Sequence, residues 1–214
     1  MRIAREARPF LLVTGLPALV AVYWAVQTAG LAANLLTILL LVLTGFIAFF
    51  FRDPERVSPP EPNAILASGD GRIVAVEPIE DPWVGDAVKV SVFLSIFNVH
   101  VNRMPCAGRV ERVEHVPGQF KLAFVDKASE DNERTEIAVE GAAGRVIVKQ
   151  IAGLIARRIV CRLVPEQRVE AGERFGLIRF GSRIDHILPA SAEIRVAIKD
   201  RVLGGETVIG VLTT

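Results

Sequence analysis

The hydrophobic residues of this chain are concentrated at its N-terminus, in two runs that cover residues 9–30 and 31–51. Neither run contains a charged residue, and each has about the 20 residues that a helix needs to cross the hydrocarbon core of a membrane. The only break between them is the short stretch 27–30 at the end of the first run. The pattern predicts a tight transmembrane helical hairpin within residues 1–52.

Arginines flank this hairpin on both sides. Arg2, Arg5 and Arg8 precede the first run, Arg52 and Arg56 follow the second, and the turn between the runs carries no charge. Because positive residues are retained on the cytoplasmic side, both ends of the hairpin are expected in the cytoplasm. The hairpin would then anchor the chain in the cell (inner) membrane, with the remaining residues on the cytoplasmic side.

Two other interpretations of the apolar runs are weaker. A signal peptide cleaved near residues 29–33 would have an unusually long apolar region, and a second run follows it at once. A hairpin buried in a soluble core would normally keep a polar stripe on each helix. A spanning hairpin therefore fits the pattern best.

Beyond the hairpin the pattern changes to short β-type runs bounded by glycine. Residues 51–64 are rich in proline and charge, which is typical of a linker, and we assign the linker to residues 53–67. The runs that follow alternate or are β-branched: GRIVAVEPI, DAVKVSVFL, GRVERVEHV, RTEIAVEG, GRVIVKQIAG and IRVAIKD. Residues 68–214 are expected to form a mainly β domain.

A weak internal repeat narrows the fold. SGDGRIVAVEPI (68–79) resembles PCAGRVERVEHV (105–116), and QRVEAGERFGLIRFG (167–181) resembles DRVLGGETVIGVL (200–212). Paired units of this kind favour a folded-over β-sandwich of the barrel-sandwich type. The predicted fold is therefore a mainly β domain preceded by a transmembrane helical hairpin.

Charge and cysteine content exclude some classes of protein. Lys and Arg total 25 and Asp and Glu total 24, so the basic excess of a nucleic-acid-binding surface is absent from the sequence. Cys106 and Cys161 are too few for a disulfide scaffold, and we interpret both as small buried residues in a reducing compartment. Cys106 follows His100 closely, so a thiol nucleophile is an alternative, although nothing else in the sequence supports it.

Five stretches, in this order behind a hydrophobic hairpin, resemble the short-form phosphatidylserine decarboxylases. They are FFRDPER (50–56), SGDGRI (68–73), FNVHVNRMP (97–105), VPGQFKLAFVDKASEDNER (116–134) and RFGSRID (179–185). The resemblance implies that the chain cuts itself between Gly181 and Ser182 and that Ser182 becomes a covalent pyruvoyl cofactor, with no metal. The two resulting chains would stay together and convert phosphatidylserine in the membrane into phosphatidylethanolamine.

The resemblance also implies which residues act. Self-cleavage needs a base near Ser182, and His100 is the best candidate because its ordinary pKa lies near working pH. Asp70, on a Gly-Asp-Gly turn, would hold the imidazole in the useful tautomer. From the sequence alone, Asp70 is also a good turn residue and His100 a packing residue. His115 and His186 lie outside matching motifs and are expected to be surface or packing residues.

Arg103 marks a departure from the family pattern. Long-form members carry a second histidine where this chain has Arg103, so the division of labour between self-cleavage and decarboxylation stays open. Arg103 is also a candidate for binding the lipid phosphate or carboxylate, because guanidinium geometry suits both groups.

Two alternatives come from other classes of protein. FVDKAS (124–129) resembles the hairpin of lipoyl or biotinyl carrier modules, which would make Lys127 a modified residue, but the following EDNER is too charged for the returning strand of that hairpin. A membrane-anchored β scaffold without catalysis would leave the spacing of Asp70, His100 and Ser182 as a coincidence. The oligomeric state, including a homo-oligomer, stays open.

Overall fold

The computed structural model describes residues 2–119, 132–142, 144–154, 158–179 and 181–213. The chain forms two compact units, Met1–Glu55 and Arg56–Thr214, and each is described by itself. The expected boundaries were residues 1–52 for the hairpin, 53–67 for the linker and 68–214 for the β domain. The observed division falls inside the expected linker, after Glu55.

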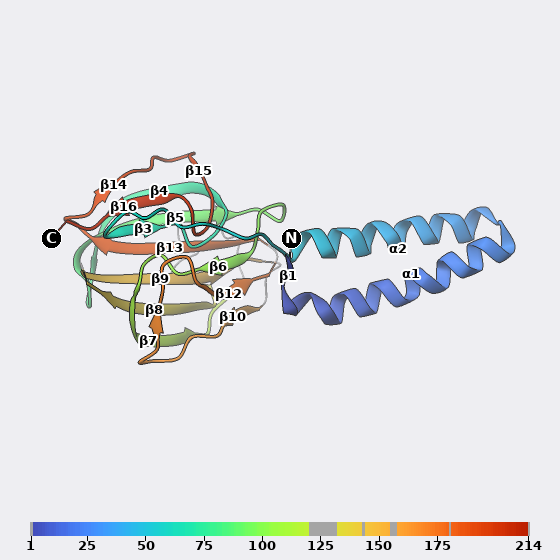
Figure 1. Ribbon diagram of the computed structural model, residues 1–214, viewed down its shortest axis with the longest axis horizontal. Coiled ribbons are helices and arrows are strands. Elements are labelled where there is room, and N and C mark those ends of the chain that lie inside the picture. Colours follow the sequence, from blue (N-terminus) through green and yellow to red (C-terminus); the bar gives the residue numbers. More distant parts are fainter. Residues whose placement is uncertain (1, 120–131, 143, 155–157, 180, 214) are drawn as a thin grey trace. The chain divides into compact units, whose positions relative to one another are not determined.

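The first unit is a helical hairpin. After a short β1 (Arg2–Ile3) and a 3-10 turn η1 (Arg5–Ala7), α1 (Arg8–Thr28) and α2 (Leu31–Phe50) run side by side in opposite directions (Figure 1). The two predicted apolar helices are therefore present, and both are long and apolar enough to cross a membrane by length and composition. That they span a membrane stays a prediction.

The two ends of this hairpin are joined. Ala29 ends α1 in the left-handed conformation, with φ +49°, and the chain then turns into α2. At the opposite end, β1 pairs antiparallel with β2 (Arg52–Asp53). The segments that enter and leave the hairpin therefore lie together.

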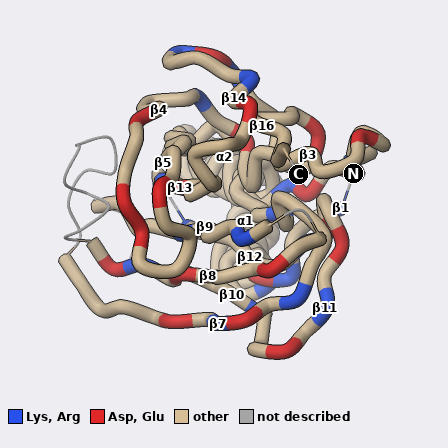
Figure 2. The backbone as a smooth tube through the Cα atoms, turned by 90° about the vertical axis from the view of Figure 1, so that its left-hand side faces the viewer, with Lys and Arg blue, Asp and Glu red and all other residues tan. Residues whose placement is uncertain are grey.

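The second unit is built almost entirely from strands, which confirms the predicted mainly β class. Its large sheet has the order β11-β7-β8-β9-β13-β5-β4-β15, and two smaller sheets have the orders β10-β12-β6 and β14-β16-β3. The large sheet is curled, and Figure 2 shows β5, β13, β9 and β8 between β4 on one side and β7 on the other. The strand bounds are β3 (Ala64–Leu66), β4 (Gly71–Asp81), β5 (Gly85–Leu94), β6 (Val101–Arg103), β7 (Gly108–Val116), β8 (Arg134–Gly141), β9 (Gly144–Ala152), β10 (Ile159–Cys161), β11 (Arg168–Val169), β12 (Arg174–Ile178), β13 (Ser182–Pro189), β14 (Glu193–Ile194), β15 (Arg201–Val202) and β16 (Val208–Val211).

The order of the strands has an internal symmetry about the β9–β13 pair. On one side the sheet continues β8, β7 and β11; on the other it continues β5, β4 and β15. One small sheet contains β6, which precedes β7, and β12, which follows β11. The other contains β3, which precedes β4, and β16, which follows β15. The predicted repeat is thus confirmed: β6 to β12 form one half, and β3 to β5 with β13 to β16 form the other.

Equivalent glycines begin the repeated strands. Gly71 of β4 is paired with the edge strand β15, and Gly108 of β7 with the edge strand β11. A Cβ atom at Gly71 would lie 2.3 Å from the Phe93 carbonyl oxygen, and one at Gly108 would lie 2.6 Å from that of Glu140. Only glycine permits this close backbone approach, so the SGDGR and PCAGR motifs have a shared structural cause.

The main core lies on one face of the central strands. Side chains alternate between faces along a strand, so Ser182, Ile184, His186 and Leu188 of β13 share one face. Ile184 and Leu188 belong to the main apolar cluster, together with Val90, Val92 and Leu94 of β5 and Val146, Val148 and Ala152 of β9. Ser182 therefore points to the core side of the sheet.

Candidate active site

Ser182 occupies the first position of the central strand β13. Its Cα pairs with Leu94 at the end of β5 and with Ala152 at the end of β9. The residue is 0% exposed, and its hydroxyl forms no hydrogen bond within the described part of the chain. A buried polar group without a partner costs free energy, so such a group in a folded protein calls for a functional explanation.

Gly181 supplies the matching backbone feature. Its φ of +72° lies in the left-handed region, which glycine adopts without strain. A Cβ atom at this position would have no described atom within 4 Å, so it is the positive φ, and not a close contact, that favours glycine here. The two residues together place a buried hydroxyl next to a glycine in the left-handed conformation.

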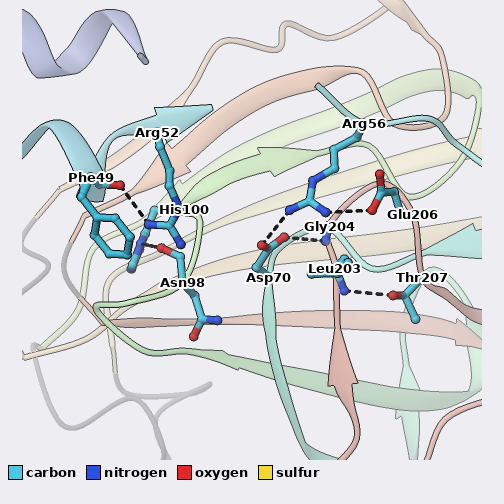
Figure 3. Close-up of polar contacts among 10 residues, drawn as sticks. All are labelled: Phe49, Arg52, Arg56, Asp70, Asn98, His100, Leu203, Gly204, Glu206 and Thr207. Atoms are coloured by element: carbon cyan, nitrogen blue, oxygen red, sulfur yellow. Dashed lines mark hydrogen bonds and ion pairs between the residues drawn. The ribbon is translucent and has the colours of Figure 1, made fainter. Parts of the chain in front are cut away.

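His100 lies in the connection from β5 to β6. Asn98 closes a turn there, because its N–H donates to the Ser95 carbonyl at 2.9 Å and its Oδ1 accepts the Ser95 hydroxyl at 2.7 Å. The Nδ1 atom of His100 lies 3.0 Å from the Asn98 carbonyl oxygen (Figure 3). A carbonyl only accepts hydrogen bonds, so neutral His100 carries its proton on Nδ1 and its lone pair on Nε2. This is the tautomer that a base requires.

Two buried amides tie the His100 segment to the sheet beside Ser182. Gln150 of β9 pairs with Ile184 of β13, and its Nε2 donates to Asn102 Oδ1 at 2.7 Å. Asn102 Nδ2 in turn donates to the His100 carbonyl at 3.3 Å. Neither Asn102 nor Gln150 is among the residues that the sequence motifs predict to act. Asn102 lies inside the FNVHVNRMP motif, whereas Gln150 is only a polar residue in an apolar strand.

Asp70 is held by a different set of groups. Its Oδ2 lies 2.9 Å from Arg56 Nη2, and its Oδ1 accepts the N–H of Gly204 at 2.8 Å. Arg56 also binds Glu206, with Nη1 2.7 Å from Oε2. Figure 3 draws Asp70 bound to Arg56 and Gly204, and His100 bound to Asn98. A role for Asp70 in orienting His100 stays a prediction.

Arg103 is buried rather than directed to solvent. It is 5% exposed, and its Nη1 donates to the Gly172 carbonyl at 3.0 Å. Its stem packs so tightly against Gly205 that a Cβ atom there would lie 2.6 Å from Arg103 Cδ. In this conformation the guanidinium supports backbone, and its proposed contact with a lipid headgroup stays a prediction.

The remaining candidates differ in position. His115 is exposed on β7, whereas His186 is fully buried on β13, in line with the expected surface and packing roles. Cys106 is buried, and burial raises the pKa of its thiol to about 12, which argues against a thiol nucleophile. Lys127, the residue of the carrier hypothesis, lies outside the described residues.

His186 is fully hydrogen-bonded as a neutral ring. Its Nε2 accepts the backbone N–H of Ser68 at 3.0 Å, so Nδ1 carries the proton and faces the Val90 carbonyl at 3.3 Å. Burial lowers the pKa of His186 from 6.5 to about 4. The ring therefore stays neutral and fixes the SGDG turn against β13.

Comparison with known proteins shows which family the chain belongs to. The sequence model described as phosphatidylserine decarboxylase matches residues 43–210. This chain belongs to the phosphatidylserine decarboxylase family. The resemblance drawn from the motifs is thereby confirmed.

Several curated members of the family align over most of the chain, and each is named phosphatidylserine decarboxylase proenzyme. The Chlorobaculum parvum protein is 45% identical over 185 residues, which cover 86% of this chain and 85% of that protein. The Paraburkholderia xenovorans protein is 44% identical over 212 residues, covering 98% and 97%. The Desulfotalea psychrophila protein is 41% identical over 211 residues, covering 97% and 95%.

We predict that His186 makes folding stability fall at acidic pH. Unfolded His186 takes up a proton below its ordinary pKa of 6.5 and the folded residue only near 4, so stability present above pH 6.5 is lost as pH falls from 6.5 to 4. Between pH 7.5 and 5.5 the loss is about 1 kcal/mol. The measurement is the unfolding midpoint of a Ser182→Ala protein at both values, with and without His186→Gln.

His115→Gln is the control, because that histidine is exposed. It should leave the pH difference unchanged, whereas His186→Gln should reduce it. An equal pH difference in all three proteins would show that His186 is not the responsible group.

Proposed function

We propose that this chain is a proenzyme that cleaves itself between Gly181 and Ser182 and then decarboxylates phosphatidylserine to phosphatidylethanolamine. The observation that carries the proposal is the buried, unpartnered Ser182 hydroxyl beside a left-handed glycine. Family membership supplies the reaction, since the relatives are named phosphatidylserine decarboxylase proenzyme.

The cleavage chemistry uses groups of the chain itself. The Ser182 hydroxyl attacks the Gly181 carbonyl while His100 Nε2 takes the hydroxyl proton, and the amide nitrogen leaves with a proton, giving an ester and a free amine. A base then removes the α-proton of Ser182, and Gly181 departs as a carboxylate. Water hydrolyses the remaining enamine and releases ammonia, which leaves a pyruvoyl group on residue 182.

The strand arrangement suits a residue that becomes a new chain end. β13 pairs with β5 along one edge and β9 along the other, so residue 182 keeps neighbours on both sides after the peptide bond is lost. A pyruvoyl group at this position supplies an electron-accepting carbonyl for decarboxylation. The surrounding core residues, Leu94, Ala152 and Ile184, would limit the access of water.

The hairpin gives the proposed activity a location. Phosphatidylserine is a membrane lipid, and a chain with two apolar spans stays in the same bilayer as its substrate. We place the β unit on the cytoplasmic side, because arginines flank both outer ends of the hairpin and the turn has none.

The first prediction of this proposal concerns the covalent state. Protein purified from membranes should consist of residues 1–181 and 182–214, and the shorter chain should lack a free amine and react with carbonyl reagents. Ser182→Ala removes the attacking oxygen and should give a single full-length chain. Intact-mass measurement separates the outcomes: an uncleaved, active wild type contradicts self-cleavage, and an adduct on Lys127 favours the carrier alternative.

A second prediction concerns the base. His100→Ala should slow cleavage by at least about a hundredfold, which is the usual contribution of a general base. Arg103→Ala should leave cleavage largely intact and weaken lipid turnover if Arg103 binds the headgroup. The ratio of cut to uncut chain over time gives the first result, and a separate decarboxylation assay gives the second. Normal cleavage in His100→Ala, with Arg103→Ala uncut, would show that His100 is not the base for cleavage.

A third prediction concerns topology. A reporter fused to the C-terminus should be active in the cytoplasm, and the protein should resist extraction by high salt, because burial of two apolar helices does not depend on screened charges. The control is a reporter inserted at Gly30, in the turn, which should lie across the membrane. Release by salt, or a C-terminal reporter outside the cytoplasm, would contradict the spanning hairpin.

A further inference from the structure

Asp70 belongs to a compact group of charged and backbone atoms. This group joins parts of the β unit that are far apart in the sequence. Arg56 and Asp70 come from the N-terminal side of this unit, whereas Gly204 and Glu206 lie in the connection between β15 and β16. Figure 3 shows the guanidinium of Arg56 between the carboxylates of Asp70 and Glu206. We call these four residues the Arg56 clasp.

Each contact in the clasp has the geometry of a charge-assisted hydrogen bond. Arg56 uses separate nitrogens for its two partners, Nη2 for Asp70 at 2.9 Å and Nη1 for Glu206 at 2.7 Å. Asp70 adds a bond from the Gly204 N–H at 2.8 Å. The side chains of Arg56 and Asp70 are only 12% and 9% exposed, so water screens their attraction far less than that of a surface pair.

Backbone bonds extend the same connection. The N–H of Gly205 donates to the Ala67 carbonyl at 2.8 Å, and the N–H of Ala67 donates to the Thr207 carbonyl at 2.9 Å. The hydroxyl of Ser58 also donates to the Gly205 carbonyl at 3.0 Å. The 203–207 loop is thus held from one side by residues 56–70.

The Arg56 clasp joins residues that lie on opposite sides of the proposed cleavage point between Gly181 and Ser182. All residues on one side of it precede the proposed cleavage point, and Gly204 and Glu206 follow it. We propose that the Arg56 clasp is an interchain lock, which keeps the chain of residues 182–214 attached to the rest after self-cleavage. This inference rests on the proposed function, and it gives Asp70 a binding role that is separate from any role beside His100.

A second ion pair provides a matched control. Arg195 binds Glu61 and Glu193, so it also joins the segment after residue 182 to the segment before residue 181. Its side chain is 38% exposed, and exposed pairs contribute little to stability. Arg195→Ala removes the same charge as Arg56→Ala without touching the clasp.

The first measurement is made on uncleaved Ser182→Ala protein, so it does not depend on self-cleavage. Hydrogen exchange of the 203–207 amides should be roughly 10- to 100-fold faster in Arg56→Ala, the factor expected for losing a hydrogen bond to a charged group. Arg195→Ala should leave these amides unchanged, and Arg56→Lys should be intermediate, because one ammonium cannot reproduce the two-pronged contact. If Arg56→Ala also unfolds the unit, Glu206→Gln provides the milder test.

The second measurement uses the cleaved protein with a tag at the C-terminus. In rising urea, residues 182–214 should separate from the longer chain at a lower concentration in Arg56→Ala or Glu206→Gln than in Arg195→Ala. Equal exchange at 203–207 in Arg56→Ala and Arg195→Ala, or equal urea concentrations for release, would overturn the lock. A wild-type chain that never cleaves would instead overturn the proposed function and leave the exchange result standing.

Discussion

The antiparallel pairing of β13 with β5 and β9 is the constraint on which the rest of the candidate site depends. It fixes Ser182 opposite Leu94 and Ala152, and it directs the hydroxyl to the core side of the sheet. A slip of one residue would turn Ser182 to the other face and bring Arg183 into the core. That register is secured on the opposite face, where buried Arg183 lies 2.7 Å from Asp185 Oδ1 and donates to the Ser91 hydroxyl at 2.7 Å.

The internal repeat places His100 and Gly181 in the two connections between its halves. The chain builds β3 to β5, leaves to build all of β6 to β12, and returns at β13. The connection from β5 to β6 contains His100, and the connection from β12 to β13 contains Gly181, directly before Ser182 begins β13. Neither His100 nor Gly181 belongs to a strand, so neither has the pairing requirements that fix Gly71 and Gly108, whereas Ser182 is paired on both edges.

Sequence patterns were sufficient for the features that local rules control. Uncharged runs of spanning length specified the hairpin, and glycines that lead into β-branched runs specified the strands and their duplication. The partners of Asp70 were not accessible in this way. Arg56 is separated from it by a proline-rich segment that reads as linker, and Gly204 lies 134 residues away, so the contacts depend on tertiary register. The same holds for Gln150, whose partner Asn102 lies on another sheet.

The burial of Ser182 bears on what the proposed cleavage would yield. An ester between Gly181 and Ser182 has two fates: attack by water would leave an ordinary serine terminus, whereas removal of the α-proton leads to the pyruvoyl group. Ser182 is 0% exposed at the start of a strand paired on both edges, which disfavours attack by bulk water and leaves proton removal as the favoured fate. The later hydrolysis does require water. When the Gly181 carboxylate leaves, the chain that precedes β13 is no longer bonded to it, and water would reach residue 182 at this step.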